Sequence, residues 1–370
     1  GRLQPGVMGK PIAMLDRIRE LLGLHFHPEW GSTYWLKRQD QLGWNVHDRV
    51  RTPEDLWLLG PMPLADLHRF PLADFIPRGL HGQFPHFVVG ETAGTSGQPC
   101  ATAYRDDEFE EAFVMPFVRV AKATGFPHGR PWLWVGPSGP HIIGKVVREL
   151  ARQTGSMDPF SVDFDPRWAK RLAEGSTARQ RYLDHVIDQA LAVLRREDIG
   201  VLFITPPALA ALAERLSARE RDSIRGIHYG GMSLTPESVN CFRSAFPNAV
   251  HLAGYGNTLF GVVMEVVDGH RLAMDYFPLG NRVFFHVVAG ANESNAFPSW
   301  PPTPTEPGQS GRVVFHRLDE SCLLVGVVER DQAESIPPRP EALALGGSMD
   351  GLRNPQTPPT LAGRLQKGLY

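Results

Sequence analysis

The sequence predicts an α/β fold, in which a mostly parallel sheet is flanked by helices and continues into a smaller β-rich subdomain. Up to Leu259, short apolar runs alternate with amphipathic helical patterns, as in a series of strand–helix units. Beyond Leu259 the helical patterns give way to successive strand-like segments. The chain has 370 residues, of which 42% are hydrophobic, so it can bury a large core as one domain or two coupled subdomains.

The first two predicted regions are an N-terminal helical cap, over 10–80, and an α/β body, over 81–259. The cap is rich in Trp, His and Pro, with one amphipathic helix at 14–22 and helical turns at 52–59. The body is expected to alternate two kinds of element. Its strands are predicted at 87–89, 132–135, 201–204, 226–229 and 250–253, and its helices at 106–122, 142–153, 179–195 and 207–216.

The remaining regions are a β-rich subdomain, over 260–336, and a tail, over 337–370. Successive prolines between 297 and 308 require an exposed loop, because proline removes the donors that a sheet needs. The tail is rich in Pro and Gly and weakly patterned. Strands of the subdomain are predicted at 261–267, 283–288, 312–315 and 323–328.

Charge and cysteine content exclude several classes of partner. The formal net charge is −2 and no long run of Lys or Arg occurs, so neither nucleic acid nor an anionic membrane is expected as a partner. The three cysteines, Cys100, Cys241 and Cys322, are too widely spaced for a disulfide framework or a CxxC-type zinc site. We expect no metal-ligand cluster, and a reducing, cytoplasmic compartment.

The segment with the clearest chemical signal is the loop at 92–99, which directly follows the strand predicted at 87–89. It combines two glycines with three hydroxyl side chains. Glycines allow backbone N–H groups to approach an anion, and hydroxyls donate further hydrogen bonds. The loop is therefore a candidate phosphate-binding loop, and an ordinary flexible turn is the alternative.

This loop, TAGTSGQPC, resembles the TSGTTGxPK phosphate loop of adenylate-forming enzymes: acyl-CoA synthetases, luciferases and peptide-synthetase adenylation domains. Three further segments follow in the family's order. HYGGMSLTPE at 228–237 resembles GGAxLxPE, and GYGNT at 254–258 resembles GYGxTE. Residues 311–331 are similar to the GELVxTxL…RYRTxD region of phenylacetate-CoA ligases. The resemblance covers about 80–350 and implies the large N-terminal body of the adenylate-forming fold.

The resemblance implies a role for each matched position. The residues implied to donate hydrogen bonds to the nucleotide phosphates are Thr92, Gly94, Thr95, Ser96 and Gly97. Thr258 would contact the adenylate phosphate, which makes Thr95, Ser96 and Thr258 the implied catalytic residues.

The other matched positions imply a pocket for the nucleoside and the acid. Tyr255 would lie against the adenine, and Asp331 would accept hydrogen bonds from both ribose hydroxyls, which suits a carboxylate. His141 would orient the acid carboxylate. Space for adenine and acyl group would come from Gly230, Gly231, Gly254 and Gly256, with His228 and Tyr229 as walls. Plainer alternatives are a solvated loop aspartate and core packing of the rings.

The chain departs from the family pattern at charged positions. Cys100 replaces the lysine of the phosphate loop, and Leu259 replaces the glutamate that holds magnesium. Each lost contact of this kind costs on the order of 10²-fold in rate. Residues 346–350 align with the GRxDD hinge, with Gly347 in place of arginine. Only a short tail follows Asp350, so the C-terminal domain with its catalytic lysine, and hence coenzyme A, are not expected.

In these departures the chain resembles the adenylating proteins of phenazine-antibiotic biosynthesis, which lack a C-terminal domain. That resemblance implies ATP-dependent activation of an aromatic carboxylic acid, a phenazine acid, as an acyl adenylate. The expected ligands are ATP or AMP and Mg²⁺, and the expected partners are the acid, a reductase or acyl-acceptor enzyme, and a second copy of the chain. Two functions stay open: an active ligase, or a catalytically impaired carrier or scaffold that binds the carboxylate or the nucleotide.

Overall fold

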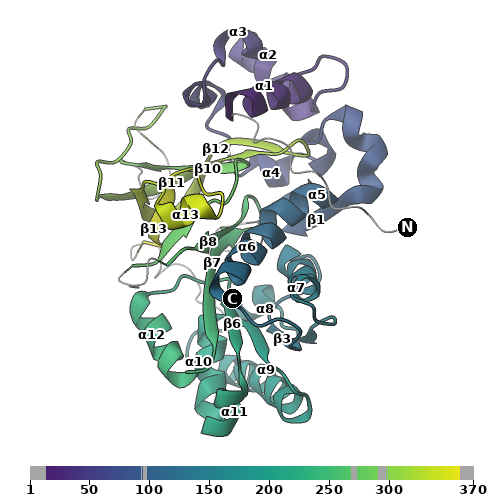
Figure 1. Ribbon diagram of the computed structural model, residues 1–370. Helices are drawn as coiled ribbons and strands as arrows, with labels where there is room; N and C mark the ends of the chain where they lie inside the picture. Colours follow the sequence, from purple (N-terminus) through teal and green to yellow (C-terminus); the bar gives the residue numbers. More distant parts are fainter. Residues whose placement is uncertain are drawn as a thin grey trace.

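The structure is a computed structural model that describes residues 14–92, 94, 98–267, 273–290, 297 and 299–358. Its N-terminal part is a group of short helices at one end of the molecule (Figure 1). The helix predicted at 14–22 runs to His25 and buries Ile18, Leu21 and Leu22 along one face. The elements are α1 (Met14–His25), α2 (Thr33–Leu42), α3 (Val46–Arg49), η1 (Pro53–Leu59), α4 (Asp66–Arg69), η2 (Leu72–Asp74) and η3 (Arg78–His86).

Two strands, β1 (Phe87–Glu91) and β2 (Ala101–Arg105), form an antiparallel hairpin after these helices. The candidate phosphate loop connects them. The chain then enters the main sheet, whose strands are flanked by helices. The helices are α5 (Asp106–Phe109), a π-helical turn η4 (Glu110–Val114), α6 (Met115–Thr124), α7 (Ile142–Gln153), α8 (Pro166–Ala169), α9 (Thr177–Arg196), α10 (Pro206–Arg215), α11 (Ala218–Ser223), α12 (Pro236–Ala245) and α13 (Pro340–Ala344).

Within the described residues the main sheet has 11 strands in the order β10-β11-β12-β13-β9-β8-β7-β6-β5-β3-β4. From β4 to β7 neighbouring strands are parallel, and from β7 to β10 they are antiparallel. The strands are β3 (Trp132–Val135), β4 (Phe160–Val162), β5 (Val201–Ile204), β6 (Gly226–Tyr229), β7 (Val250–Asn257), β8 (Gly261–Glu265), β9 (Asp275–Phe277), β10 (Val283–Val288), β11 (Ser310–Leu318), β12 (Leu323–Ile336) and β13 (Gly351–Gln356).

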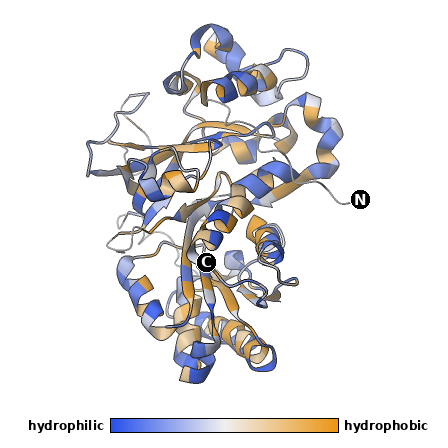
Figure 2. Ribbon diagram, in the orientation of Figure 1, coloured by the Kyte–Doolittle hydropathy of each residue, from blue (hydrophilic) through white to orange (hydrophobic). Residues whose placement is uncertain are grey.

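The parallel half is buried on both faces, which explains its continuous apolar strands. In β3, Trp132 and Trp134 pack with α6 and α7, whereas Leu133 and Val135 pack with α9 and α10 on the opposite face. Figure 2 shows these strands as mainly hydrophobic between helices with hydrophilic outer sides. The α/β class predicted from the alternating pattern is confirmed.

Strand β7 joins the two halves of the sheet. Its first residues pair in parallel with β6, and residues 254–257 pair with β8 in the antiparallel direction. The predicted division at 259–260 therefore lies beside a strand shared by both regions, and the β-rich segment continues the same sheet.

The region predicted as a weakly patterned Pro- and Gly-rich tail, 337–370, contains two regular elements in its described part. They are α13 and β13, and β13 lies inside the sheet between β12 and β9. Asn354, at a φ of 50°, and the following Pro355 make the segment unlike a regular strand in sequence. Two ion pairs from Arg353 to Asp275 and Glu334 hold it in register.

Among the described helices, none is long and apolar enough to cross a membrane.

Candidate functional site

The predicted site residues follow the carboxyl ends of parallel strands, where ligands bind in open α/β sheets. The turn after β3 leads to His141, which directly precedes α7. The end of β6 leads to Gly230, and β7 carries the 254–257 segment. These ends lie at the same edge, because β3, β5, β6 and the start of β7 are parallel neighbours.

Four segments meet at Glu91, the last residue of β1. Its N–H donates to the Pro140 carbonyl oxygen at 2.9 Å, in the turn that contains His141. Its carbonyl oxygen accepts from Thr258 Oγ1 at 3.4 Å, and its carboxylate accepts from Arg167 Nη2 at 2.8 Å. We call these four residues, Glu91, Pro140, Thr258 and Arg167, the Glu91 junction. It joins the start of the candidate phosphate loop to Thr258.

The base of the candidate phosphate loop is closed by Thr92 and Cys100. The Thr92 N–H donates to the Cys100 carbonyl oxygen, and Thr92 Oγ1 accepts from the Cys100 N–H, both at 2.9 Å. Gly94 has a φ of 66°, a left-handed conformation that glycine adopts without steric strain. Thr95, Ser96 and Gly97 lie outside the described residues, so their contacts with phosphate stay predictions.

Cys100 stands where the family's loop has lysine, and its side chain faces the protein interior. The residue is 7% exposed, and its Sγ lies 3.6 Å from the Leu64 carbonyl oxygen. Burial raises the pKa of the thiol. A buried, protonated thiol supplies neither positive charge nor a ready nucleophile. Cys100 is therefore a small packed residue, in agreement with simple replacement of the lysine.

Tyr255 and Asp331 meet although three strands separate β7 from β12 in the sheet order. The Tyr255 hydroxyl donates to Asp331 Oδ2 at 3.2 Å, and Thr357, just after β13, donates to Oδ1 at 2.8 Å. Burial and the charge of Asp331 raise the pKa of Tyr255, so its phenol stays a donor. A carboxylate offers about four acceptor positions, which leaves capacity at Asp331 for further donors.

Sequence reasoning missed two polar residues beside this pair, Asn257 and Glu329. Asn257 Nδ2 donates to the Glu329 carboxylate, and its Oδ1 accepts from the N–H groups of Leu259 and Phe260. Asn257 thereby fixes the turn that follows β7. Glu329 lies two residues before Asp331 on β12, and the period of two along a strand would have placed both on one face.

Glu329 makes the stability of the site depend on pH. Burial, and next the negative charge of Asp331, raise the pKa of Glu329 to about 7. The folded chain then holds a proton that the unfolded chain releases near pH 4.3. The contribution of Glu329 to stability is therefore fully present below that pH and is lost as pH rises through about 7. Between pH 4.5 and 7.5 the free energy of unfolding should fall less in the Glu329→Gln variant than in wild type, by roughly 1–3 kcal/mol. Urea unfolding at a series of pH values measures this, and parallel profiles would contradict it.

Gly254 and Gly256, both predicted to leave space, face crowded surroundings. A Cβ on Gly256 would lie 2.1 Å from the Gly261 carbonyl oxygen across the β7–β8 hairpin. A Cβ on Gly254 would lie 2.8 Å from Val262 Cγ2 and 3.4 Å from His228 Cε1. Both positions thus require glycine for packing of the protein itself, and their contact with a ligand stays a prediction.

Gly256→Ala is expected to destabilise the protein by about 1–3 kcal/mol, since the Cβ meets backbone rather than a movable side chain. Thermal unfolding measures the loss. Gly23→Ala is a suitable control, because a Cβ there meets nothing within 4 Å and the position lies in α1. Equal melting temperatures for the Gly256 variant and wild type would show that the hairpin can open without cost.

The glycine pair after β6 continues the strand into a turn. A Cβ on Gly230 would lie 2.8 Å from Phe203 Cε2, and Gly231 has a φ of 80° that favours glycine. This turn therefore depends on both glycines before any ligand is considered, and their predicted contact with adenine is untested.

His228 and Tyr229 are both buried but lie on opposite faces of the sheet. His228 packs against Phe203, with ring centroids 4.3 Å apart, and burial lowers its pKa to about 4. The Tyr229 hydroxyl hydrogen-bonds with His251 Nδ1 at 2.6 Å near Phe242 of α12. Because the two side chains lie on opposite faces of the sheet, they cannot both be walls of a single pocket. His228 lies next to Gly254, and its role as a pocket wall stays a prediction.

His141 lies beside the Glu91 junction at the start of α7. Burial, and next the positive charge of Arg167, lower its pKa. Its imidazole is therefore neutral near pH 7, and the predicted orienting role would rely on hydrogen bonding rather than charge.

Comparison with solved structures identifies the fold. The chain superposes on 2-hydroxyisobutyryl-CoA ligase in the postadenylation state in complex with 2-HIB-AMP, with a TM-score of 0.66 and 14% identity over 93% of this chain and 66% of the ligase. The same ligase with 2-HIB-AMP and CoA, in the thioesterification state, gives a TM-score of 0.64 and the same identity and coverage. The chain has the fold of adenylate-forming CoA ligases.

The chain spans 66% of the length of the ligase that it matches. No protein-family model matches the chain, and no curated protein matches its sequence. At 14% identity the likeness establishes the architecture, and the activity is a separate question.

Leu259 stands where the family carries its magnesium-binding glutamate, and its surroundings do not fit a cation. It is 3% exposed and belongs to the main hydrophobic core. Its carbonyl oxygen accepts from Arg317 Nη1 at 3.2 Å. Mg²⁺ prefers oxygen ligands, and the apolar side chain of Leu259 offers none.

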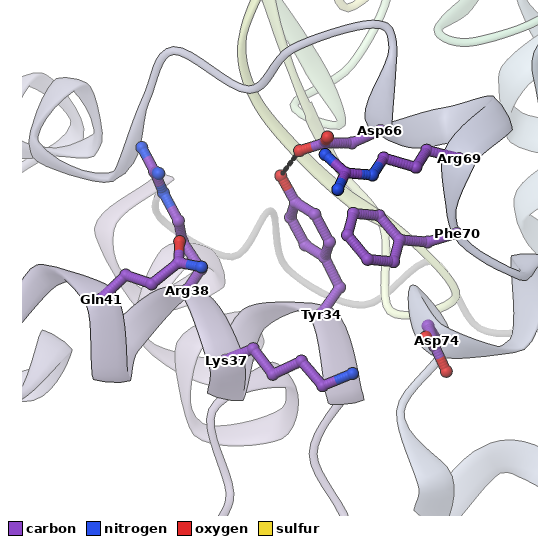
Figure 3. A pocket seen from close by; sticks show the side chains of 8 residues that line it. All are labelled: Tyr34, Lys37, Arg38, Gln41, Asp66, Arg69, Phe70 and Asp74. Carbon is purple, nitrogen blue, oxygen red and sulfur yellow. Dashed lines mark hydrogen bonds between the residues drawn. The ribbon is translucent and has the colours of Figure 1, made fainter.

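A separate pocket of about 230 Å³ lies between α2, α4 and η2 in the N-terminal part (Figure 3). The Tyr34 hydroxyl donates to Asp66 at 2.8 Å across it. Three basic and two acidic side chains nearly balance its charge, and none of the predicted site residues lines it. The lining residues are Tyr34, Lys37, Arg38, Gln41, Asp66, Arg69, Phe70 and Asp74.

Proposed function

We propose that the chain binds ATP together with an aromatic carboxylic acid and joins them into an acyl adenylate, with phenazine acids as the substrate class and secondary metabolism as the setting. The observation that carries this proposal is the convergence of matched residues. The candidate phosphate loop begins at the Glu91 junction, which includes Thr258. Tyr255 lies three residues before Thr258 in the sequence and contacts Asp331.

The reaction assigns a task to each group. One oxygen of the acid carboxylate attacks the α-phosphorus of ATP, the bond from that phosphorus to the bridging oxygen breaks, and pyrophosphate leaves. Asp331 accepts hydrogen bonds from the ribose hydroxyls, and Tyr255 contacts the adenine. The Thr92 hydroxyl donates a hydrogen bond to a phosphate oxygen, and the Thr258 hydroxyl exchanges its long hydrogen bond to the Glu91 carbonyl oxygen for one to phosphate. His141 orients the acid. Donors positioned before the reaction stabilise charge that develops in the transition state.

A second function is favoured by Cys100 and Leu259, which replace two charged groups of the family. In that case the chain holds the nucleotide or the acid without transferring the adenylyl group, as a carrier or scaffold for a partner enzyme. Both functions use the same binding residues and differ in turnover alone.

Acid-dependent release of pyrophosphate from ATP separates the two functions. The panel should include benzoic, hydroxybenzoic and phenazine carboxylic acids, with calorimetry of ATP, AMP and each acid in parallel. Release with an aromatic acid supports the ligase, and binding without release under any condition supports the carrier. An absence of binding for every nucleotide and acid would overturn both.

A further inference from the structure

The described part of the phosphate loop lacks the positive charge that a polyphosphate needs. Cys100 is buried and protonated, as described above. In nucleotidyl transfer, charge on the phosphates is stabilised mainly by cations. If the proposed function holds, a basic side chain from another part of the chain has to lie near this loop. The inference below rests on that function.

Arg167, from α8, reaches this loop across 75 residues of sequence. Its Nη2 donates to Glu91 Oε2 at 2.8 Å and to the Thr92 carbonyl oxygen at 3.3 Å. Thr92 is the first residue of the phosphate loop, and the Glu91 carbonyl oxygen also accepts from Thr258. Arg167 is therefore a basic side chain in contact with the backbone that leads into the loop.

The backbone of Arg167 is held in place by the residues around it. Asp165 caps α8, and its carboxylate accepts the Arg167 N–H at 2.8 Å. The Asp165 N–H in turn donates to the Tyr182 hydroxyl oxygen of α9 at 2.8 Å. Pro166, the first residue of α8, and Ala169 are both buried. These contacts fix the base of the side chain, so its head can be directed without a large loss of entropy.

The guanidinium of Arg167 has donor capacity beyond these contacts. Only Nη2 is bonded among the described residues, and Nε is buried there without an acceptor. A guanidinium carries five N–H donors, and buried donors in native structures are normally satisfied. The side chain as a whole is about one-third exposed, so its head can still meet a ligand from solvent.

Further positive charge surrounds Arg167. Lys170, at the end of α8, has its pKa lowered to about 8 by burial and then by the charges of Arg330 and Arg167. Arg330 lies next to Asp331 on β12, with 3.8 Å between its Nε and Asp331 Oδ1. Among the described residues, Arg167 forms an ion pair with one carboxylate, that of Glu91. The three basic groups together favour an anion between α8 and β12.

We propose that Arg167 binds the phosphates of ATP and supplies the positive charge that the lysine of the phosphate loop provides elsewhere in this fold. Arginine suits this role because its planar head can bind two phosphate oxygens at once. In the absence of nucleotide, Glu91 holds the side chain beside the loop. When ATP is bound, the phosphate oxygens take the remaining donors.

Calorimetry of ATP, AMP and adenosine with wild type, Arg167→Gln and Glu91→Gln tests this proposal. We expect Arg167→Gln to raise the Kd of ATP at least about 10-fold, the Kd of AMP less, and that of adenosine hardly at all, because the lost interaction is with phosphate. Glu91→Gln removes the paired carboxylate and keeps the cation, so ATP should bind as tightly as in wild type or more tightly. Arg148→Gln, which removes another ion-paired arginine, on α7, is the matched control.

A merely structural Arg167 gives a different pattern. If it only ties α8 to β1, Arg167→Gln and Glu91→Gln lose affinity equally and for all three ligands, which would overturn the proposal. Unchanged ATP binding in Arg167→Gln would also overturn it and leave the proposed function standing. If wild type binds no nucleotide at all, the proposed function itself fails. Thermal unfolding of each variant establishes that it is folded.

Discussion

Asp331→Ala is expected to lower kcat/KM for ATP in acid-dependent pyrophosphate release by at least about 100-fold. Two hydrogen bonds from ribose hydroxyls to an ionised carboxylate contribute about 1.5–3 kcal/mol each, and the alanine removes both. For a carrier without turnover, the same variant should raise the Kd of ATP and AMP by a similar factor. Pyrophosphate release and calorimetry measure the two quantities.

Two controls separate the ribose contact from the protein's own contacts of Asp331. Thr357→Val removes the hydroxyl that donates to Asp331 Oδ1 and leaves the carboxylate. We expect it to change nucleotide affinity by less than about 3-fold, since the freed oxygen is solvated or bound by the ribose. If Asp331→Ala binds ATP as wild type does, the ribose is held elsewhere and the site assignment is wrong.

Asp319→Ala is expected to cost about 3–5 kcal/mol of stability, because it leaves two arginines without their buried counter-charge. Asp319 is 1% exposed and accepts hydrogen bonds from Arg282 and from Arg317, which is fully buried. Arg317 also stacks on the ring of Tyr104, with its Cζ 3.6 Å from the ring centroid. Urea unfolding measures the loss.

The control for this ion pair is Asp198→Ala. Asp198 pairs with Arg130 at 3.2 Å on the surface, where such a pair contributes about 0–1 kcal/mol. Burial alone would raise the pKa of Asp319, but Arg282 and Arg317 hold it below its usual value. The stabilisation is therefore present above about pH 4 and lost as pH falls further. Equal losses for the two alanine variants would show that burial adds nothing.

This buried network also reaches the site. Arg317 donates to the Leu259 carbonyl oxygen, and the Tyr104 hydroxyl donates to the Thr258 carbonyl oxygen at 2.8 Å. Two buried side chains, Arg317 and Tyr104, thus hold the turn that carries Thr258 in place. An Asp319 variant that still folds should bind ATP more weakly for this reason.

Strands and helices of the parallel half could be predicted closely from the sequence. The predicted ranges 132–135, 201–204 and 142–153 agree with β3, β5 and α7, because short apolar runs and a regular helical period are local signals. Helix α2 was missed, since its buried face consists chiefly of Tyr34 and Trp35 rather than a repeating aliphatic pattern.

The site was predictable only where a motif carried it. Thr92, Thr258, Tyr255 and Asp331 resemble family segments. In the structure Tyr255 contacts Asp331, and Thr258 contacts Glu91, the residue before Thr92. Arg167 belongs to no recognised motif, and its contact with Glu91 depends on how α8 packs beside β1. Such long-range contacts leave no local pattern in a single sequence.

Strand β13 has a consequence for how the chain can move. Strand β13 pairs with β12 on one side and, at Leu352 and Arg353, with β9 on the other. The residues at 346–350 therefore cannot act as a swivel without pulling a strand from the middle of the sheet. Just after Gln356 the Thr357 hydroxyl donates to Asp331, so the chain leaves the sheet beside the carboxylate that we propose for the ribose.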